Sequence, residues 1–298
     1  MGEKCSLCPR ECGADRTEKR GFCGADDKIY VAKAYLHKWE EPPISGDDEK
    51  RGSGTIFFSN CQLRCPFCQN YEISQNGVGK VISVSELAKI MLNLQNEGAY
   101  NINLVSPTPY LPQIIEAIRQ CGDRLKIPVA MNTGGYEKAQ IIEEISPYVR
   151  IFLPDVKFYS KDLSQKYLKA PDYFDKAVSA LGAMINEVGA SQFDSDGIMK
   201  SGVIVRHLVM PGCYRDSLKI LEELHRRFGN DSFLLSLMSQ YTPLYHAEKY
   251  SEINRKITTF EYEKVLMCAN ELGFSGFSQQ KSSADEGFVP SWDFEGID

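Results

Sequence analysis

Three cysteines within eight residues carry the clearest chemical signal in this sequence. Cys61, Cys65 and Cys68 are spaced C-x3-C-x2-C and directly follow the β-branched and aromatic run 55–58. Three thiolates on one short loop can ligate three irons of a cubane [4Fe–4S] cluster. The fourth iron then has no protein ligand. An open coordination position is what catalysis needs, whereas a structural metal site is closed.

An open iron predicts a second cofactor. S-adenosylmethionine (SAM) can chelate such an iron through its amino and carboxylate groups. An electron passed into the sulfonium then breaks an S–C bond and leaves a 5′-deoxyadenosyl radical. The alternative is a closed zinc or iron–sulfur site that is completed by a fourth cysteine. The place of the loop, after the first strand of an alternating α/β chain, favours the open cluster.

A second group of cysteines lies at the N-terminus. Cys5, Cys8, Cys12 and Cys23 are spaced C-x2-C-x3-C-x10-C, on a segment with few apolar residues of its own. Clustered thiols in a reducing compartment are more often metal ligands than disulfides. The spacing predicts a closed structural site, which zinc and an auxiliary [4Fe–4S] cluster would suit equally. The alternative is a set of reduced surface cysteines without a metal.

The elements that must position these cysteines alternate along the chain. Strand-like runs lie at 55–58, 102–105, 127–130, 151–154, 203–209 and 233–237. Helical patterns fall at about 83–97, 111–121, 137–146, 171–188, 216–228 and 259–272, the first with a capping box at Ser83 and Glu86. Six strands alternating with six helices indicate parallel βαβ units. The fold class is therefore α/β, either an open, partial (β/α)6 barrel or a doubly wound sheet.

The chain divides into two unequal parts. Residues 1–49 form a small Cys-rich extension and linker that we expect to be irregular, with the proline-containing stretch 40–48 as the linker. Residues 50–298 form the α/β domain, whose C-terminal tail, around 282–292, could cover the open end of the sheet.

Composition excludes several classes of function. The chain has 298 residues and a net charge of −6, so a broad nucleic-acid surface is disfavoured. No apolar run approaches the ~18 residues of a membrane-spanning helix. We expect a cytoplasmic protein without a membrane partner.

Several phrases of the sequence resemble a known family. SGTIFFSNCQLRCPFCQNYEIS, YNINLVSPTPY, LPDVKF, IVRHLVMPG and SLMSQYTP are similar to radical SAM enzymes. With CPRECG, RGFCG and EEPPISG, they resemble the proteins related to pyruvate formate-lyase activating enzyme that carry an N-terminal cysteine segment. The resemblance implies a radical SAM barrel, reductive SAM cleavage and an oxidoreductase. It is specific for the cofactor and weak for the substrate.

The resemblance also assigns residues to the cofactor. It places Phe67 against the adenine and Asn70 in the cluster loop. Ser106 and Thr108 belong to a stretch, SPTP, that stands where the family has Gly-Gly-Glu-Pro. Without that Glu, backbone carbonyls or these two hydroxyls must take the SAM ammonium.

The remaining assignments fall on later strand ends. Asn132 and Thr133 face the SAM ribose and carboxylate; the activating enzyme has Asp where Asn132 stands, so a monovalent cation is in doubt. Asp155 and Lys157 match the family's Asp-Leu-Lys, and Lys157 can pair with the SAM carboxylate. The ring of contacts is completed by Arg206 and Gln240. Each charged residue has a structural alternative: Asp155 with Lys157 as an ion pair, and Arg206 held by a neighbouring carboxylate.

The resemblance extends to partners as expectations. It implies a flavodoxin or ferredoxin-type electron donor and, as substrate, a glycine of a glycyl radical enzyme. Modification of a peptide, a small molecule or RNA is the alternative. An alternative of another class is a non-catalytic iron–sulfur carrier or scaffold, which would not need the strand-end residues.

Overall fold

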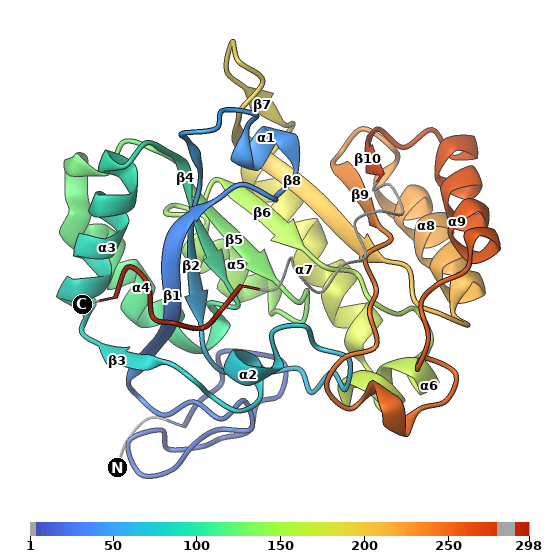
Figure 1. Ribbon diagram of the computed structural model, residues 1–298, viewed down its shortest axis with the longest axis horizontal. Helices are drawn as coiled ribbons and strands as arrows, with labels where there is room; N and C mark the ends of the chain where they lie inside the picture. The colour runs from blue at the N-terminus through green and yellow to red at the C-terminus, as the bar shows by residue number, and fades with distance from the viewer. Residues whose placement is uncertain (1–3, 279–289, 298) are drawn as a thin grey trace.

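A curved, mostly parallel sheet organises the chain (Figure 1). The computed structural model describes residues 4–278 and 290–297. In these residues ten strands form a sheet in the order β10-β9-β8-β6-β5-β4-β2-β1-β3, with β7 paired to β8. The strands are β1 (Ile29–His37), β2 (Gly52–Phe58), β3 (Lys80–Ile82), β4 (Ala99–Val105), β5 (Val129–Thr133), β6 (Ile151–Pro154), β7 (Gln192–Phe193), β8 (Met199–Leu208), β9 (Leu234–Met238) and β10 (Gly276–Ser278).

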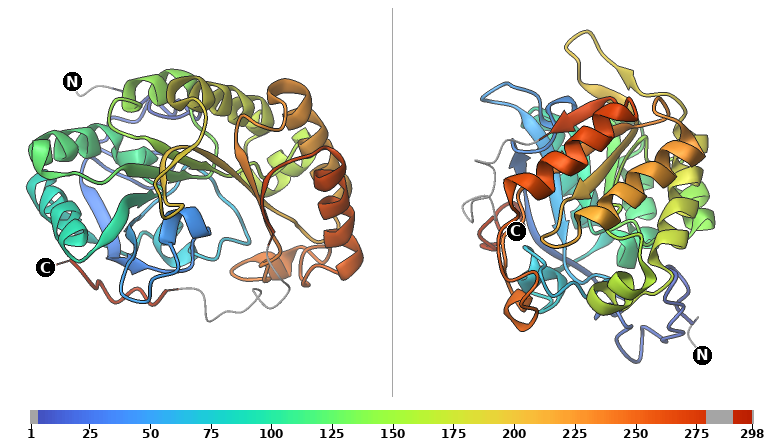
Figure 2. Two further views of the ribbon diagram at one scale, coloured as in Figure 1. Left: turned by 90° about the horizontal axis from the view of Figure 1, so that it is seen from above. Right: turned by 90° about the vertical axis from the view of Figure 1, so that its right-hand side faces the viewer.

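Neighbouring strands from β2 to β10 run parallel, and β1 continues the sheet antiparallel to β2. The helices are α1 (Pro42–Ser45), α2 (Tyr71–Ser74), α3 (Val84–Asn96), α4 (Leu111–Cys121), α5 (Ala139–Ile145), α6 (Lys161–Leu163), α7 (Tyr173–Val188), α8 (Tyr214–Phe228) and α9 (Thr259–Glu271). The long helices cover the convex face of the sheet, and α1 lies inside its curvature (Figure 2). This is the partial barrel that the family resemblance implies. The alternation of strands and helices also allowed a doubly wound sheet, which the long helices on one face exclude.

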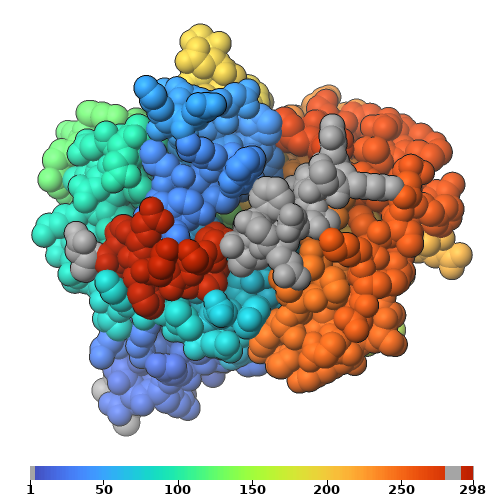
Figure 3. All heavy atoms as spheres, in the orientation of Figure 1, coloured from blue at the N-terminus to red at the C-terminus, as the bar shows by residue number. Residues whose placement is uncertain are grey.

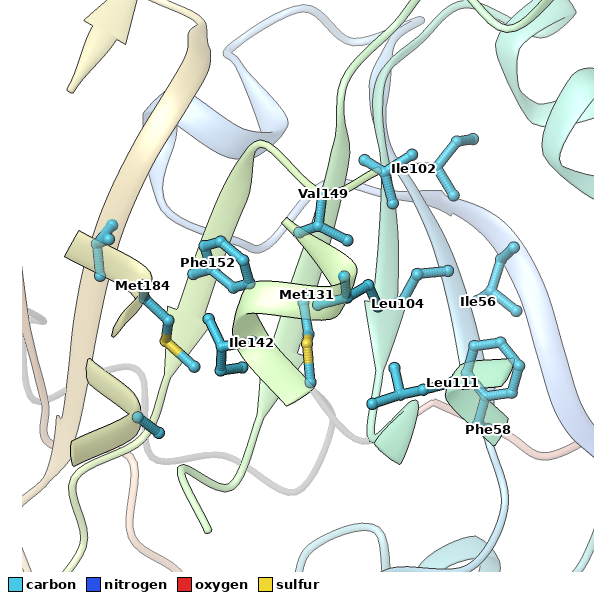
Figure 4. Close-up of a cluster of buried hydrophobic side chains, with 14 of the residues drawn as sticks. Ile56, Phe58, Ile102, Leu104, Leu111, Met131, Ile142, Val149, Phe152 and Met184 are labelled. Atoms are coloured by element: carbon cyan, nitrogen blue, oxygen red, sulfur yellow. The ribbon is translucent and has the colours of Figure 1, made fainter. Parts of the chain in front are cut away.

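The main core lies between the convex face of the sheet and the helices (Figure 4). In β2, Ile56 and Phe58 face these helices, whereas Phe57 faces the concave side. This alternation follows from the period of two in a strand. The predicted capping box of α3 is confirmed: Ser83 Oγ accepts from the N–H of Glu86 at 3.2 Å, and Glu86 accepts from the N–H of Ser83 at 2.6 Å.

The N-terminal part is more ordered than its composition predicts. The short apolar run beginning at Ile29 extends into β1, which pairs with β2 and β3. The stretch expected to be a linker forms α1, because Pro42 stands in its first turn, where a proline is compatible with a helix. Ile44 is fully buried in a cluster with residues of β5, β6 and β8, among them Ala130, Leu153 and Ile204. The strand β5 begins at Val129 rather than at residue 127, and the short strands β3, β7 and β10 were not predicted.

The described end of the C-terminal tail, residues 290–297, lies beside β1 (Figure 3). Residues 282–289 of the predicted tail lie outside the described residues. In the described part, the N–H of Ala34 donates to the carbonyl of Glu295 at 2.9 Å. The Trp292 ring lies 5.3 Å from that of Phe57, which is on the concave face. This end of the tail therefore packs against β1 and against the concave face of the sheet.

Candidate active site

The loop after β2 brings Cys61, Cys65 and Cys68 to the carboxyl end of the sheet. Cys65 is buried, the other two are half-buried, and all three are free thiols. The loop turns sharply at Asn60, whose φ is +71° and whose side chain donates to the Tyr110 hydroxyl at 2.8 Å. Asparagine tolerates this left-handed conformation better than most residues.

The surroundings of the three sulfurs fit a [4Fe–4S] cluster. The N–H of Leu63 donates to Cys61 Sγ at 3.5 Å, and the Ser74 hydroxyl lies 3.2 Å from Cys68 Sγ. Such hydrogen bonds to sulfur are one of the means by which proteins tune cluster potentials. Burial raises the pKa of Cys61 to about 12, so metal binding must release the proton of this thiol.

Lys157 lies close to all three cysteines. Its ammonium contacts the Asp155 carboxylate and lowers the pKa of each of the three thiols, against the larger effect of burial. Burial lowers the pKa of Lys157, but the charge and hydrogen bond of Asp155 together with the nearby Cys65 and Tyr173 outweigh it, so the pKa is raised and the side chain stays charged. The Lys157 side chain is only 19% exposed. A buried ammonium is thus held beside the cysteine loop.

Glycine is required where the end of β5 approaches Asp155 and Lys157. A Cβ at Gly135 would lie 2.0 Å from the Asp155 carbonyl oxygen, and the residue has a φ of +79°. The hydroxyl of Tyr173 lies 2.8 Å from the Gly134 carbonyl and 2.9 Å from that of Asp155. The glycines therefore let the β5 and β6 strand ends approach each other closely.

Arg206 has different partners from those of Lys157. Its Nε donates to Glu41 at 2.9 Å, and its Nη2 contacts the carboxylates of both Glu40 and Glu41. These glutamates come from the segment that leads into α1, some 165 residues away in sequence. The sequence left open whether Arg206 faces SAM or a neighbouring carboxylate; the structure provides two carboxylates.

The other predicted residues also lie at the carboxyl ends of strands. Phe67 is buried, with its ring 6.3, 6.2 and 6.0 Å from those of Phe158, Tyr167 and Tyr241. The Gln240 carbonyl accepts from Gln69 in the cysteine loop at 3.3 Å. Asn70 precedes α2 and accepts from the Ser74 N–H at 2.9 Å, while Asn132 accepts through its carbonyl from the Ser106 N–H at 2.9 Å.

One buried carboxyl was missed by the sequence analysis. Glu137 is fully buried and accepts hydrogen bonds from Gln62, Thr108 and Thr133. The Thr108 and Thr133 hydroxyls thus face Glu137. A Glu two residues after a Gly-Gly turn, close to the strand end, was the only available signal, and it is a weak one.

The N-terminal cysteines lie next to the same loop. Arg10 donates to the Gln62 carbonyl at 3.0 Å and to the Leu168 carbonyl at 2.7 Å, and Arg64 of the cysteine loop reaches back to the Phe22 carbonyl. A Cβ at Gly21 would lie 3.5 Å from both Cys12 Sγ and Cys23 Sγ. The segment is therefore docked beside the candidate cluster site.

Comparison with known proteins identifies the family. Residues 55–212, which include the three cysteines of the loop and the ends of strands β2 to β8, match the Radical SAM superfamily. The chain belongs to the radical SAM superfamily. Radical SAM chemistry requires a [4Fe–4S] cluster and SAM, and Cys61, Cys65 and Cys68 fit the cluster by number, spacing and hydrogen bonding.

Three individual proteins are similar to this radical SAM protein. An uncharacterized protein of Methanocaldococcus jannaschii is 30% identical over 90% of this chain and 75% of its own length. The pyruvate formate-lyase-activating enzyme of Clostridium pasteurianum is 27% identical over 44% of this chain and 58% of its own. The structure of methylornithine synthase has a TM-score of 0.49 at 14% identity, covering 73% of this chain and 60% of that one.

Two further observations bear on the site. In the part of this radical SAM protein that the structure describes, no three His, Cys, Asp or Glu side chains are grouped as ligands of a single metal ion. Within the same described residues, no helix is long and apolar enough to span a membrane.

Proposed function

We propose that this radical SAM protein cleaves SAM at a cluster held by Cys61, Cys65 and Cys68 and abstracts the α-hydrogen of a glycine in a partner glycyl radical enzyme. When bound, the cluster supplies the electron that breaks the SAM S–C bond and yields the 5′-deoxyadenosyl radical. The likeness to the C. pasteurianum activating enzyme supports the glycine as target. The observation that carries the proposal is the buried Lys157 ammonium beside three free thiols.

Lys157 is the residue that we assign to the SAM carboxylate. A bound carboxylate would share the ammonium with Asp155, which already contacts it, and both side chains are about four-fifths buried. Charge-assisted hydrogen bonds in such a site are stronger than neutral ones. Asp155, Asn132 and Ser106 then surround the amino acid end of SAM, and Phe67 with its aromatic neighbours borders the adenine.

The four N-terminal cysteines complete the proposal. Cys5, Cys8, Cys12 and Cys23 hold a metal that fixes their segment against the radical loop through Arg10. Zinc and a second iron–sulfur cluster would both suit four thiolates. A flavodoxin or ferredoxin-type protein in the cytoplasm is the proposed electron donor.

Anaerobic reconstitution tests this function. The purified chain is loaded with iron and sulfide, mixed with SAM and dithionite, and incubated with a candidate glycyl radical enzyme. The proposal predicts release of 5′-deoxyadenosine and a glycyl radical signal in the partner by electron paramagnetic resonance. Release of 5′-deoxyadenosine with a peptide, a small molecule or RNA, and not with such a partner, would reject the glycine target. No 5′-deoxyadenosine at all would favour the non-catalytic carrier.

A further inference from the structure

The buried carboxyl of Glu137 uses one oxygen as a common acceptor. Gln62 Nε2 and Thr108 Oγ1 each donate to Oε1 at 2.8 Å, and Thr133 Oγ1 contacts the same oxygen. The second oxygen, Oε2, is buried and has no hydrogen-bond partner among the described residues. All the side chains in this group are at most 2% exposed.

The three donors come from three neighbouring strand ends. Gln62 is next to Cys61 in the loop after β2, Thr108 follows β4, and Thr133 is the last residue of β5. These strands are adjacent and parallel, in the order β2-β4-β5. One oxygen therefore fixes the relative positions of the cysteine loop, the SPTP loop and the Asn132 strand end.

Among the described residues, no cation acts on the Glu137 carboxyl. Burial raises the pKa of Glu137 to about 7, and only the three donated hydrogen bonds act against that rise. Burying a polar atom without a hydrogen-bond partner costs free energy, and Oε2 is such an atom. The carboxyl is retained despite this cost because its other oxygen, Oε1, sets the geometry of the three donors. The donors, rather than a cation, hold it in place.

We propose that Glu137 is a positioning residue of the SAM site, which acts as a shared acceptor that holds the three loops at their working distances. This inference rests on the proposed function, because it assumes that SAM binds at these strand ends. Glu137 itself touches neither the cysteines nor the cofactor in this assignment. Its acceptor oxygen, and not its negative charge, does the positioning.

Two substitutions separate the acceptor from the charge. In Glu137→Gln, the amide oxygen can still accept from all three donors, and the amide nitrogen takes the place of the unpartnered Oε2. In Glu137→Ala, all three donors lose their acceptor. Glu144→Ala, at an exposed position of α5, the helix that follows Glu137, is the matched control.

SAM titration of the reconstituted, reduced proteins by electron paramagnetic resonance tests the proposal, with iron content and melting temperature measured in parallel. Glu137→Ala should weaken SAM binding about ten- to hundredfold while about four irons stay bound to the loop cysteines. The SAM affinity of Glu137→Gln should stay within about threefold of that of the wild type, and the affinity of Glu144→Ala should equal that of the wild type.

The outcomes are distinguishable. Equal losses in Glu137→Gln and Glu137→Ala would show that the charge is required and would overturn the shared-acceptor role, as would unchanged SAM affinity in Glu137→Ala. If Glu137→Ala fails to fold, Thr108→Val removes a single donor and should weaken SAM binding by about tenfold; unchanged affinity there would equally overturn the proposal. A wild type that does not bind SAM would instead reject the proposed function on which it rests.

Discussion

Lys157 and Arg206 carry the same charge at neighbouring strand ends, yet their partners differ. Lys157 contacts one carboxylate, Asp155, and lies close to the loop cysteines. Arg206 contacts two carboxylates, Glu40 and Glu41, and is 7% exposed. A single carboxylate leaves Lys157 able to bind a second anion, whereas the pair of glutamates neutralises Arg206.

Lys157→Ala should therefore weaken SAM binding while the cluster still assembles. Loss of one hydrogen bond to a charged group costs ~1.5–3 kcal/mol, which is roughly ten- to hundredfold in affinity. SAM titration by electron paramagnetic resonance measures the change, with Lys161→Ala, at an exposed position in α6, as the control. An affinity equal to that of the wild type would mean that another residue holds the SAM carboxylate.

Arg206→Gln should act mainly on stability. Removing one partner of a buried ion pair costs ~3–5 kcal/mol, because the remaining charge is left uncompensated. Burial raises the pKa of Glu41, but the Arg206 guanidinium outweighs this effect and holds the pKa below its usual range. Without the guanidinium, two buried carboxylates face each other.

Thermal unfolding of Arg206→Gln and of the double variant with Glu41→Gln measures this effect. The double variant should recover part of the lost stability, because it removes one of the two unpaired charges. A loss of SAM affinity without a loss of stability would contradict this account and would show that Arg206 faces SAM, as the family resemblance implies.

At the scale of elements, helix α9 shows how a capping residue also anchors a neighbouring loop. Glu261 completes the capping box with Thr258 and pairs with Arg255 at 2.7 Å. It also accepts from the N–H of Gly212 at 2.6 Å, in the loop between β8 and α8. The carboxylate therefore ties α9 to the turn that follows β8.

This carboxylate makes stability depend on pH. The Arg255 guanidinium, together with the N–H groups donated by Thr258 and Gly212, lowers the pKa of Glu261 to about 2 from the ordinary value of 4.5, against the opposite effect of burial. Since the folded pKa lies below the unfolded one, its contribution is complete above about pH 4.5 and is lost as the pH falls toward about 2.

Urea unfolding between pH 6 and pH 3 checks this prediction. Glu261→Gln should have a lower free energy of unfolding than the wild type at pH 6. The difference in free energy should become smaller toward pH 3. A gap that stays constant over this range would show that the charge of Glu261 does not contribute.

The sequence predicted the local parts of the site better than the distant ones. The cysteine loop and the strand ends were recognisable because their residues are neighbours in the chain. The partners of Arg206 were not, because Glu40 and Glu41 reach it only through the folding of α1 into the barrel. Glu137 was missed for a similar reason: its donors lie 4, 29 and 75 residues away.

At the scale of the whole molecule, the N-terminal segment is docked on the loops of the barrel. Arg10 donates to the carbonyls of Gln62 and Leu168, and Lys138 pairs with Glu11 at 2.6 Å. The segment thus contacts the loops that follow β2, β5 and β6. If the four N-terminal cysteines hold the proposed metal, its loss should loosen those contacts, since a segment with little apolar core of its own depends on its metal to fold.

Metal analysis of a protein with Cys61, Cys65 and Cys68 all replaced by Ala tests the N-terminal site. After anaerobic reconstitution, about four irons per chain should remain if the segment holds a second cluster. One zinc per chain would show that the segment holds a zinc site instead of a cluster. Absence of both metals would show that these cysteines are free thiols.

The measurement that tests the central claim most directly is 5′-deoxyadenosine release by the wild type and by Cys65→Ala. Both proteins are reconstituted anaerobically with iron and sulfide and then supplied with SAM and dithionite, and Cys268→Ala, outside the loop, serves as the control. The account predicts 5′-deoxyadenosine from the wild type and the control and none above background from Cys65→Ala. Release by Cys65→Ala at the wild-type rate would contradict the assignment of the radical cluster to this loop.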